Sequence, residues 1–250
     1  MKLNPYGKLC TQVYDLSKPE PPVDAFNFYL KQAKSAGGPV LELMCGSGRF
    51  LIPLMEQGIN IEGADSSPDM LQACRVKCVR KGIKSVLYEQ LIEEITLPKK
   101  YRLIFIAGCS FILVTDKQAV RTSLRKINEY LIPGGRLVIE IETPRAVGNL
   151  GVWTGFWVER PDGATIVFNS LASYNPTEKV ERAIHKYELF ENGKLTITEL
   201  EHFAMRFYER DEFTALLQEA GFINIRATRP FVESEPDEKD AVIVFSAERA

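Results

Sequence analysis

The acids and glycines of one short stretch are the residues of this chain best suited to bind a ligand. Glu42 lies in an apolar run, Gly46 and Gly48 follow it with one residue between them, and Asp65 ends the next apolar run. Glycines permit a sharp turn and let a ligand approach the backbone closely. A carboxylate at the end of a strand can accept hydrogen bonds from ribose hydroxyls. The spacing therefore predicts a pocket for a nucleoside-bearing cofactor.

The segments around these residues predict the parallel α/β unit that would position them. Residues 40–44 and 60–65 are short apolar runs typical of central parallel strands, and 50–57 and 68–81 are predicted to be the helices that follow them. Ser67 can cap the second helix, with Pro68 at its first position. Since open parallel sheets bind ligands at the carboxyl ends of their strands, the acids and glycines should meet at one edge.

A dinucleotide-binding domain uses a related arrangement and is the main alternative. Its fingerprint needs a third glycine for close packing of helix on strand, and Leu51 occupies that position here. Glu42 would repel a diphosphate but suits a cationic ligand or an ammonium group. These residues favour a cofactor without a diphosphate, and a nicotinamide-dependent oxidoreductase stays open as an alternative function.

Three ordered motifs resemble those of the class I S-adenosylmethionine (SAM) dependent methyltransferases. Residues 42–48 resemble the first motif, 65–71 the ribose-binding second motif, and 131–137 the turn into the fifth strand; the resemblance spans residues 39–142. It implies an α/β fold, with a doubly wound, mostly parallel seven-stranded sheet and helices on both faces. It also implies SAM as cofactor and in-line methyl transfer to a small-molecule acceptor, an amine or a hydroxyl. A non-catalytic SAM-binding protein on the same fold is a second alternative.

The resemblance also implies a set of cofactor-binding residues. After the third strand, Gln90 stands where many relatives carry an acid for the adenine amino group, and its amide can both accept and donate. Tyr14 resembles an N-terminal tyrosine that covers the reactive end of SAM. The expected cofactor-binding residues are Tyr14, Glu42, Leu43, Met44, Cys45, Gly46, Gly48, Asp65, Ser66, Met70, Gln90, Leu91, Ala107, Gly108 and Ser110.

The α/β pattern is interrupted at residues 153–206. This segment is predicted to form two antiparallel hairpins, with turns at 161–163 and 191–194. The segment resembles the sheet that some small-molecule N-methyltransferases, including those acting on amino sugars, insert before their last helix. We expect a substrate roof or a homodimer interface, or alternatively aromatics that only fill the gap to the core. The predicted division is 1–37, an N-terminal segment and helix forming a cofactor lid; 38–145, the SAM-binding core; 146–207, the antiparallel β insertion; and 208–250, completing the core.

Composition narrows the classes of partner. A net charge of −2 and a sequence pI near 5.9 do not show the excess of positive charge that is typical of proteins that bind nucleic acid. No stretch is long and apolar enough to predict a membrane span, and the first residues lack the apolar run of a signal peptide. Five cysteines without paired spacing suit a reducing compartment. We expect a cytoplasmic enzyme with a small-molecule partner, no nucleic acid and no membrane.

The catalytic residue is not predicted. Methyl transfer from a sulfonium needs alignment and exclusion of water rather than a protein nucleophile. An amine must lose its proton before attack, and a hydroxyl usually needs a nearby base. Tyr14, Glu142, Tyr174 and His185 are candidates by position only. Cys74 and Cys78 lie one helical turn apart without two further soft ligands, so we predict no metal site.

Overall fold

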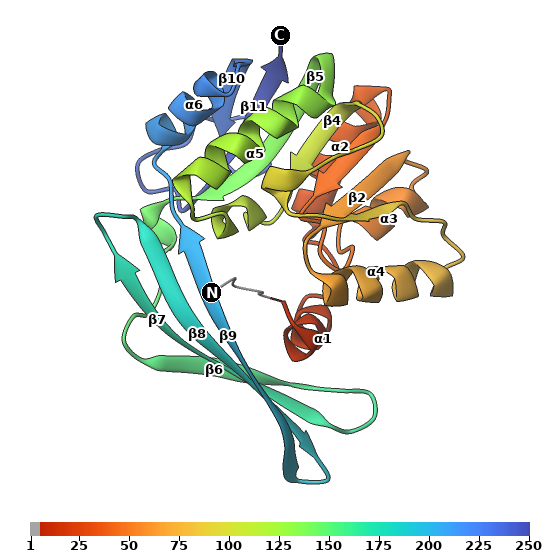
Figure 1. The fold of residues 1–250 in the computed structure, drawn as a ribbon, viewed down its shortest axis with the longest axis vertical. Coiled ribbons are helices and arrows are strands. Elements are labelled where there is room, and N and C mark those ends of the chain that lie inside the picture. The colour runs from red at the N-terminus through yellow and green to blue at the C-terminus, as the bar shows by residue number, and fades with distance from the viewer. Residues whose placement is uncertain (1–5) are drawn as a thin grey trace.

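A computed structural model describes residues 6–250 as two sheets with helices packed around them (Figure 1). The larger sheet has seven strands in the order β10-β11-β5-β4-β1-β2-β3. β11 runs antiparallel to both of its neighbours, and the remaining pairs are parallel. The predicted mostly parallel seven-stranded sheet is confirmed. Its strands are β1 (Val40–Leu43), β2 (Ile61–Asp65), β3 (Leu87–Glu89), β4 (Tyr101–Ile106), β5 (Leu131–Glu142), β10 (Phe222–Thr228) and β11 (Val242–Arg249).

Helices cover both faces of this sheet, because its central strands are apolar on both sides. Leu103 and Phe105 of β4 point into a core shared with α2, α3 and α4, whereas Ile104 and Ile106 point into a core shared with α5 and α6. The sheet is therefore buried on both faces, as parallel sheets require. The helices are α2 (Val23–Ala36), α3 (Leu51–Glu56), α4 (Pro68–Arg80), α5 (Lys117–Tyr130) and α6 (Arg210–Glu219).

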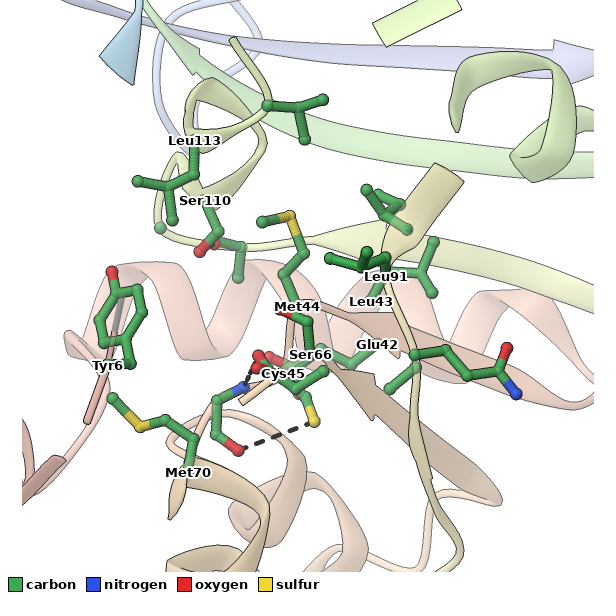
Figure 2. Close-up of a pocket in the computed structure, with 18 of the residues that line it drawn as sticks. Tyr6, Glu42, Leu43, Met44, Cys45, Ser66, Met70, Leu91, Ser110 and Leu113 are labelled. Carbon is green, nitrogen blue, oxygen red and sulfur yellow. Dashed lines mark hydrogen bonds between the residues drawn. The ribbon is translucent and has the colours of Figure 1, made fainter. Parts of the chain in front are cut away.

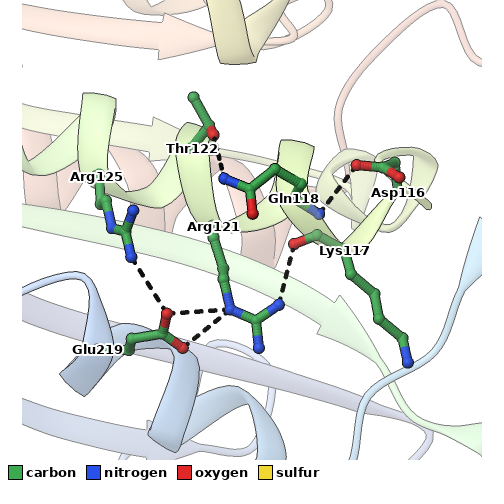
Figure 3. A network of polar contacts seen from close by, with 7 residues as sticks. All are labelled: Asp116, Lys117, Gln118, Arg121, Thr122, Arg125 and Glu219. Atoms are coloured by element: carbon green, nitrogen blue, oxygen red, sulfur yellow. Dashed lines mark hydrogen bonds and ion pairs between the residues drawn. The ribbon is translucent and has the colours of Figure 1, made fainter.

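Two of these helices begin at side-chain caps. The Ser67 hydroxyl accepts a hydrogen bond from the Met70 N–H at 3.1 Å, which confirms the predicted start of α4. The Asp116 carboxylate accepts from the N–H groups of Gln118 and Ala119 and begins α5. Figure 3 shows Arg121 and Arg125 of α5 binding Glu219 of α6, so α5 is held at its sides as well as at its start.

The smaller sheet has four strands in the order β6-β7-β8-β9, all antiparallel. Both predicted hairpins are confirmed, and Asn192 and Gly193 have the positive φ values, 52° and 74°, that their turn needs. The prediction missed the pairing of β7 with β8, which joins the hairpins into one sheet. The strands are β6 (Trp153–Glu159), β7 (Thr165–Asn175), β8 (Val180–Glu191) and β9 (Lys194–Arg206).

A helix that the sequence analysis did not predict, α1 (Lys8–Ser17), lies between the smaller sheet and α4 (Figure 1). Its apolar side chains form a separate core with the sheet, made of Leu9, Cys10, Val13, Ala164, Ile166, Tyr187 and Leu189. No residue of the seven-stranded sheet belongs to that core. By its apolar packing, α1 is therefore part of the β insertion.

Several boundaries differ from the predicted ones. α3 is one residue shorter at each end than the predicted helix at 50–57. Residues 131–137, expected as a turn, belong to β5, whose pairing with β4 shifts register between Tyr101 and Leu103. Three short 3₁₀ helices, Ile92–Glu94, Ser110–Leu113 and Pro144–Ala146, were not predicted. Between residues 6 and 250, no helix combines the length and the apolar content needed to cross a membrane.

Candidate functional site

A cavity of about 370 Å³ lies at the carboxyl ends of β1, β2 and β4, where α1 and β9 close over the larger sheet. Figure 2 shows side chains from these separate elements converging on it, Tyr6 near Met70 on one side and Leu113 near Ser110 on another. Fourteen of the fifteen expected cofactor-binding residues line the cavity: Tyr14, Glu42, Leu43, Met44, Cys45, Gly46, Asp65, Ser66, Met70, Gln90, Leu91, Ala107, Gly108 and Ser110.

Asp65 fixes the loop that follows β1. One carboxylate oxygen accepts from the Gly46 N–H at 2.7 Å, and the other accepts from the Ser67 N–H at 2.8 Å. Burial raises the pKa of Asp65, while the hydrogen bonds from Ser67 and Gly46 act against that rise. Each carboxylate oxygen has two lone pairs, so Asp65 keeps acceptor capacity toward the cavity that it lines.

The two glycines of the loop have different roles. Gly46 lines the cavity with φ +53°, and a Cβ there would meet only the Met70 sulfur, at 3.8 Å. Gly48 does not line the cavity: a Cβ there would lie 2.6 Å from the Cys74 sulfur and 2.9 Å from Ile52. The expectation that Gly48 lets a ligand approach is therefore wrong. This glycine lets the loop pack against α4.

Glu42 supplies an unpaired acid inside the cavity wall. Glu42 is 3% exposed, and among residues 6–250 its Oε2 atom has no hydrogen-bond partner. Burial raises the pKa of Glu42 well above its usual range, and the nearby Asp65 raises it further. A buried acceptor without a donor is costly unless a ligand supplies one. The ammonium of an amino-acid group, such as the one SAM carries, fits this position.

Gln90 lies at the other end of the cavity, but its amide is already engaged. Its Oε1 atom accepts from the Thr96 N–H at 2.6 Å, and its Nε2 atom donates to the Thr96 carbonyl at 3.1 Å. The expected use of this amide by the adenine amino group is therefore not supported by the geometry. Glu93, also on the cavity wall, is an acid that the sequence analysis did not select.

Only one of the four catalytic candidates, Tyr14, lines the cavity. Glu142 and Tyr174 lie outside its wall. The ring of His185 stacks on Phe203 at 4.4 Å between centroids, and burial lowers the pKa of His185 to about 4. His185 is therefore neutral over most of the pH range, and packing accounts for its place in β8.

Sequence reasoning missed several residues of the cavity wall. Arg49 directly follows Gly48, so its place in the loop could have signalled it. Tyr6 and Lys18 flank α1, which the apolar spacing of Leu9, Cys10 and Val13 could have predicted. Residues of β9 arrive only through the tertiary fold, and no local signal marks them. The missed residues include Tyr6, Lys18, Arg49, Phe50, Glu93, Leu113, Asp116, His202 and Phe203.

Comparisons with known proteins agree with this site. Residues 40–135 match the family described as a methyltransferase domain. The chain is 23% identical over 240 residues to the putative methyltransferase YqeM of Bacillus subtilis, covering 95% of each chain. Its fold is similar to the CcbJ methyltransferase of Streptomyces caelestis, with a TM-score of 0.81, 24% identity and all of both chains covered.

The sugar N-methyltransferase KedS8 of a Streptoalloteichus species shares the fold over 100% of this chain and 97% of its own, with a TM-score of 0.76 and 18% identity. The matched segment, 40–135, holds the glycine loop, Asp65 and the strands that carry them. The fold and the site define a Rossmann-like enzyme of the class I type. Residues 40–135 match a methyltransferase domain, and the fold of the whole chain is similar to that of known SAM-dependent methyltransferases.

Proposed function

We propose that this enzyme transfers the methyl group of SAM to an amine of a small polar molecule by in-line displacement. An amine acceptor is supported by two acids outside the cavity wall: Glu142 at the end of β5, which interacts electrostatically with Lys18 of the wall, and Glu181 on β8. The fold shared with a sugar N-methyltransferase supports amino sugars as the first acceptors to test.

Glu142 and Glu181 face each other between the larger sheet and the β insertion. Burial raises the pKa of Glu142, and the nearby Glu181 raises it further, while Lys18 acts against both. Burial also raises the pKa of Glu181, which is 8% exposed. Among residues 6–250, no cation lies within 4.0 Å of either carboxylate. Two desolvated acids without a close ion pair suit a protonated amine, which must give up a proton before attack.

Bound SAM supplies an electrophilic methyl group on its sulfonium. The chain's own residues bind and orient it: Asp65 accepts from the ribose, Glu42 from the ammonium, and the apolar side chains of Met70 and Leu91 enclose the base. Tyr6 and Tyr14 cover the reactive end from α1 and its flank and exclude water. Glu142 receives the proton of the acceptor amine. The predicted division into lid, core and insertion is part of this proposal, although residues 1–5 of the lid lie outside the described residues.

Calorimetric titration tests the cofactor site. Wild-type protein should bind SAM and its demethylated product, and Asp65→Ala should reduce the affinity at least about tenfold, because it removes a charge-assisted acceptor. Asp65→Asn keeps the shape and separates lost binding from lost folding. Asp69→Ala, an exposed acid four residues later, should leave the affinity unchanged. Equal affinity of wild type and both Asp65 variants would contradict the proposed ribose contact.

Methyl transfer to a panel of acceptors tests the amine. Release of demethylated cofactor should occur with amino sugars and other small polar amines and not with their hydroxyl analogues. Glu142→Gln should lower turnover most between the raised pKa of Glu142 and the pKa of the amine, where Glu142 is ionised and the amine arrives protonated. Turnover of the hydroxyl analogues alone would contradict the proposal.

We also propose that the enzyme forms a homodimer through the outer face of the smaller sheet and works in the cytoplasm. The outer face, opposite α1, carries four exposed apolar side chains at register positions of β6, β8 and β9: Trp153, Trp157, Ile184 and Leu200. A second copy would cover them. Five buried cysteines, all present as thiols, support a reducing compartment.

A further inference from the structure

Among residues 6–250, two cations line the cofactor cavity without an ion pair within 4.0 Å, and Glu142 acts on one of them, Lys18, only from farther away. Lys18 and Arg49 both belong to its wall. Among residues 6–250, no carboxylate oxygen lies within 4.0 Å of either side chain, and residues 1–5 contain no Asp or Glu. Arg49 uses its Nε atom to donate to the Glu20 carbonyl at 3.0 Å, and its side chain also interacts with the Tyr14 hydroxyl. Because a guanidinium carries five N–H donors, Arg49 still has donors for a ligand.

The charges around these cations indicate the ligand group that fits. Burial lowers the pKa of Lys18, and the nearby Arg49 lowers it further, so the two cations repel each other. Tyr14 interacts with both kinds of group: its pKa is raised by burial, lowered in part by Arg49 and raised again by Glu42. The wall therefore holds an acid whose Oε2 atom lacks a donor and two cations without an ion pair within 4.0 Å, a pattern complementary to the ammonium and carboxylate of an α-amino acid group.

The two cations belong to parts of the molecule that are otherwise joined weakly. Lys18 caps the end of α1, whose apolar side chains pack only on the β insertion. Arg49 belongs to the glycine loop of the larger domain. The polar contacts from α1 and its flanks to that domain include Asp15 with Ser47 and Lys77, the Tyr6 carbonyl with Ser67, and the Glu20 carbonyl with Arg49 itself. An anion held between Lys18 and Arg49 would add a further link.

We propose that Lys18 and Arg49 together bind the carboxylate of the cofactor's amino-acid end and that this anion fastens α1 to the glycine loop, so that the lid closes only over a carboxylate-bearing cofactor. The inference rests on the proposed placement of SAM in this cavity. Lys18 and Arg49 are then specificity-determining residues: they distinguish SAM and its demethylated product from nucleosides that lack the carboxylate.

Binding of SAM and of decarboxylated SAM to wild-type protein and four variants tests the proposal, because the two ligands differ only by the carboxylate. Lys18→Met and Arg49→Met should each weaken SAM binding about tenfold, the effect of one lost charge-assisted contact. Their affinity for decarboxylated SAM should be unchanged or higher, since a cation is removed beside a ligand with two positive charges. Lys34→Met and Arg80→Met, exposed residues of α2 and α4, serve as matched controls with no change for either ligand.

Equal weakening of both ligands by Lys18→Met and Arg49→Met, or no weakening of SAM, would overturn the inference while leaving the proposed cofactor site intact. Wild-type protein that binds neither ligand would instead contradict the proposed placement of SAM and the inference with it. The two failures are therefore distinguishable in one set of titrations.

Hydrogen exchange tests the lid directly. The amides of α1, residues 8–17, should exchange at least several-fold more slowly when saturating SAM or its demethylated product is present. Saturating decarboxylated SAM should protect the amides of α4 beside the nucleoside but leave those of α1 at the rate of the free protein. Equal protection of α1 by both ligands would overturn the proposed coupling.

Discussion

At the scale of single residues, the site depends on an acid that the free protein holds at a cost. Glu42 is buried in the wall with one oxygen unpaired, although hydrogen bonds hold both oxygens of its neighbour Asp65. We expect ligand binding to offset the free-energy cost of burying Glu42, because the ligand supplies the missing hydrogen-bond donor. Such a residue is kept for binding rather than for stability.

Glu42→Gln should therefore stabilise the free protein while weakening SAM binding. Burial raises the pKa of this carboxyl above its ordinary value of 4.5, so between that pH and the raised pKa the folded state holds more protons than the unfolded state. Wild-type stability consequently falls as pH rises through this window. The increase in the free energy of unfolding caused by Glu42→Gln should be near zero below pH 4.5 and should grow as pH rises. It should reach about 1 kcal/mol or more, which corresponds to roughly 2–4 °C in Tm.

Thermal melts from pH 4 to 8 measure this gain, and calorimetry measures SAM affinity on the same samples. Glu129→Gln, at an exposed position of α5, should change neither. A Glu42→Gln variant less stable than wild type at neutral pH would show that an internal partner compensates the charge.

Most of the residues that sequence reasoning identified lie within a few positions of a recognisable strand end, and Tyr14 is the exception. Glu42 and Asp65 follow from the strand pattern, whereas Gly108 and Tyr14 follow from the family resemblance. Lys18 and Arg49 did not stand out, because an isolated cation in a sequence is usually a solvated side chain. Only the fold shows that these two lack a close ion pair, since that property depends on every acid in the molecule.

At the scale of elements, the parallel core could be predicted and the attachment of α1 could not. The core strands contain short runs of apolar residues, and two of the core helices carry caps at Ser67 and Asp116. α1 has only ten residues and packs on strands more than 140 positions away, so its docking has no local sequence signal. The two hydrogen bonds between Gln90 and Thr96 also have no local sequence signal, because they depend on the path of the intervening loop.

Substituting each loop glycine should separate packing from binding. Gly48→Ala places a Cβ 2.6 Å from the Cys74 sulfur at φ +86°, so overpacking and backbone strain together should cost about 2–4 kcal/mol. Gly46→Ala meets nothing closer than 3.8 Å and should cost about 1–2 kcal/mol from its positive φ alone.

Urea unfolding measures both losses, and SAM titration of the folded fractions completes the comparison. Gly46→Ala should weaken SAM binding more than its small loss of stability suggests, because Gly46 lines the cavity. Gly58→Ala, which has open space around a positive φ, is the control for backbone strain without a ligand. Equal losses of stability at Gly46 and Gly48 would contradict the assigned packing role of Gly48.

At the scale of the whole molecule, the β insertion presents two different faces. Its inner face packs on α1, and its outer face leaves Trp157 68% exposed and Leu200 65% exposed. The proposed dimer would use the outer face and keep the inner face for the lid. Assembly and ligand binding would then occur on opposite sides of one sheet.

Trp157→Glu should convert the proposed dimer to a monomer without loss of SAM affinity, because a charge is placed at the centre of an apolar contact. Light scattering after size exclusion measures the mass. Val79→Glu, an exposed apolar position on α4, is the matched control and should leave the mass unchanged. A monomeric wild-type protein at working concentration would contradict the proposed dimer.

The packing of α1 on the β insertion also has a kinetic consequence. The proposed cofactor lid, α1, and the proposed acceptor roof share one apolar core, so we expect them to open and close as a unit. In the proposed placement the methyl donor lies deeper, at the strand ends, so we expect it to enter first and its demethylated product to leave last. Product inhibition should then be competitive against SAM and noncompetitive against the acceptor, the signature of an ordered sequential enzyme.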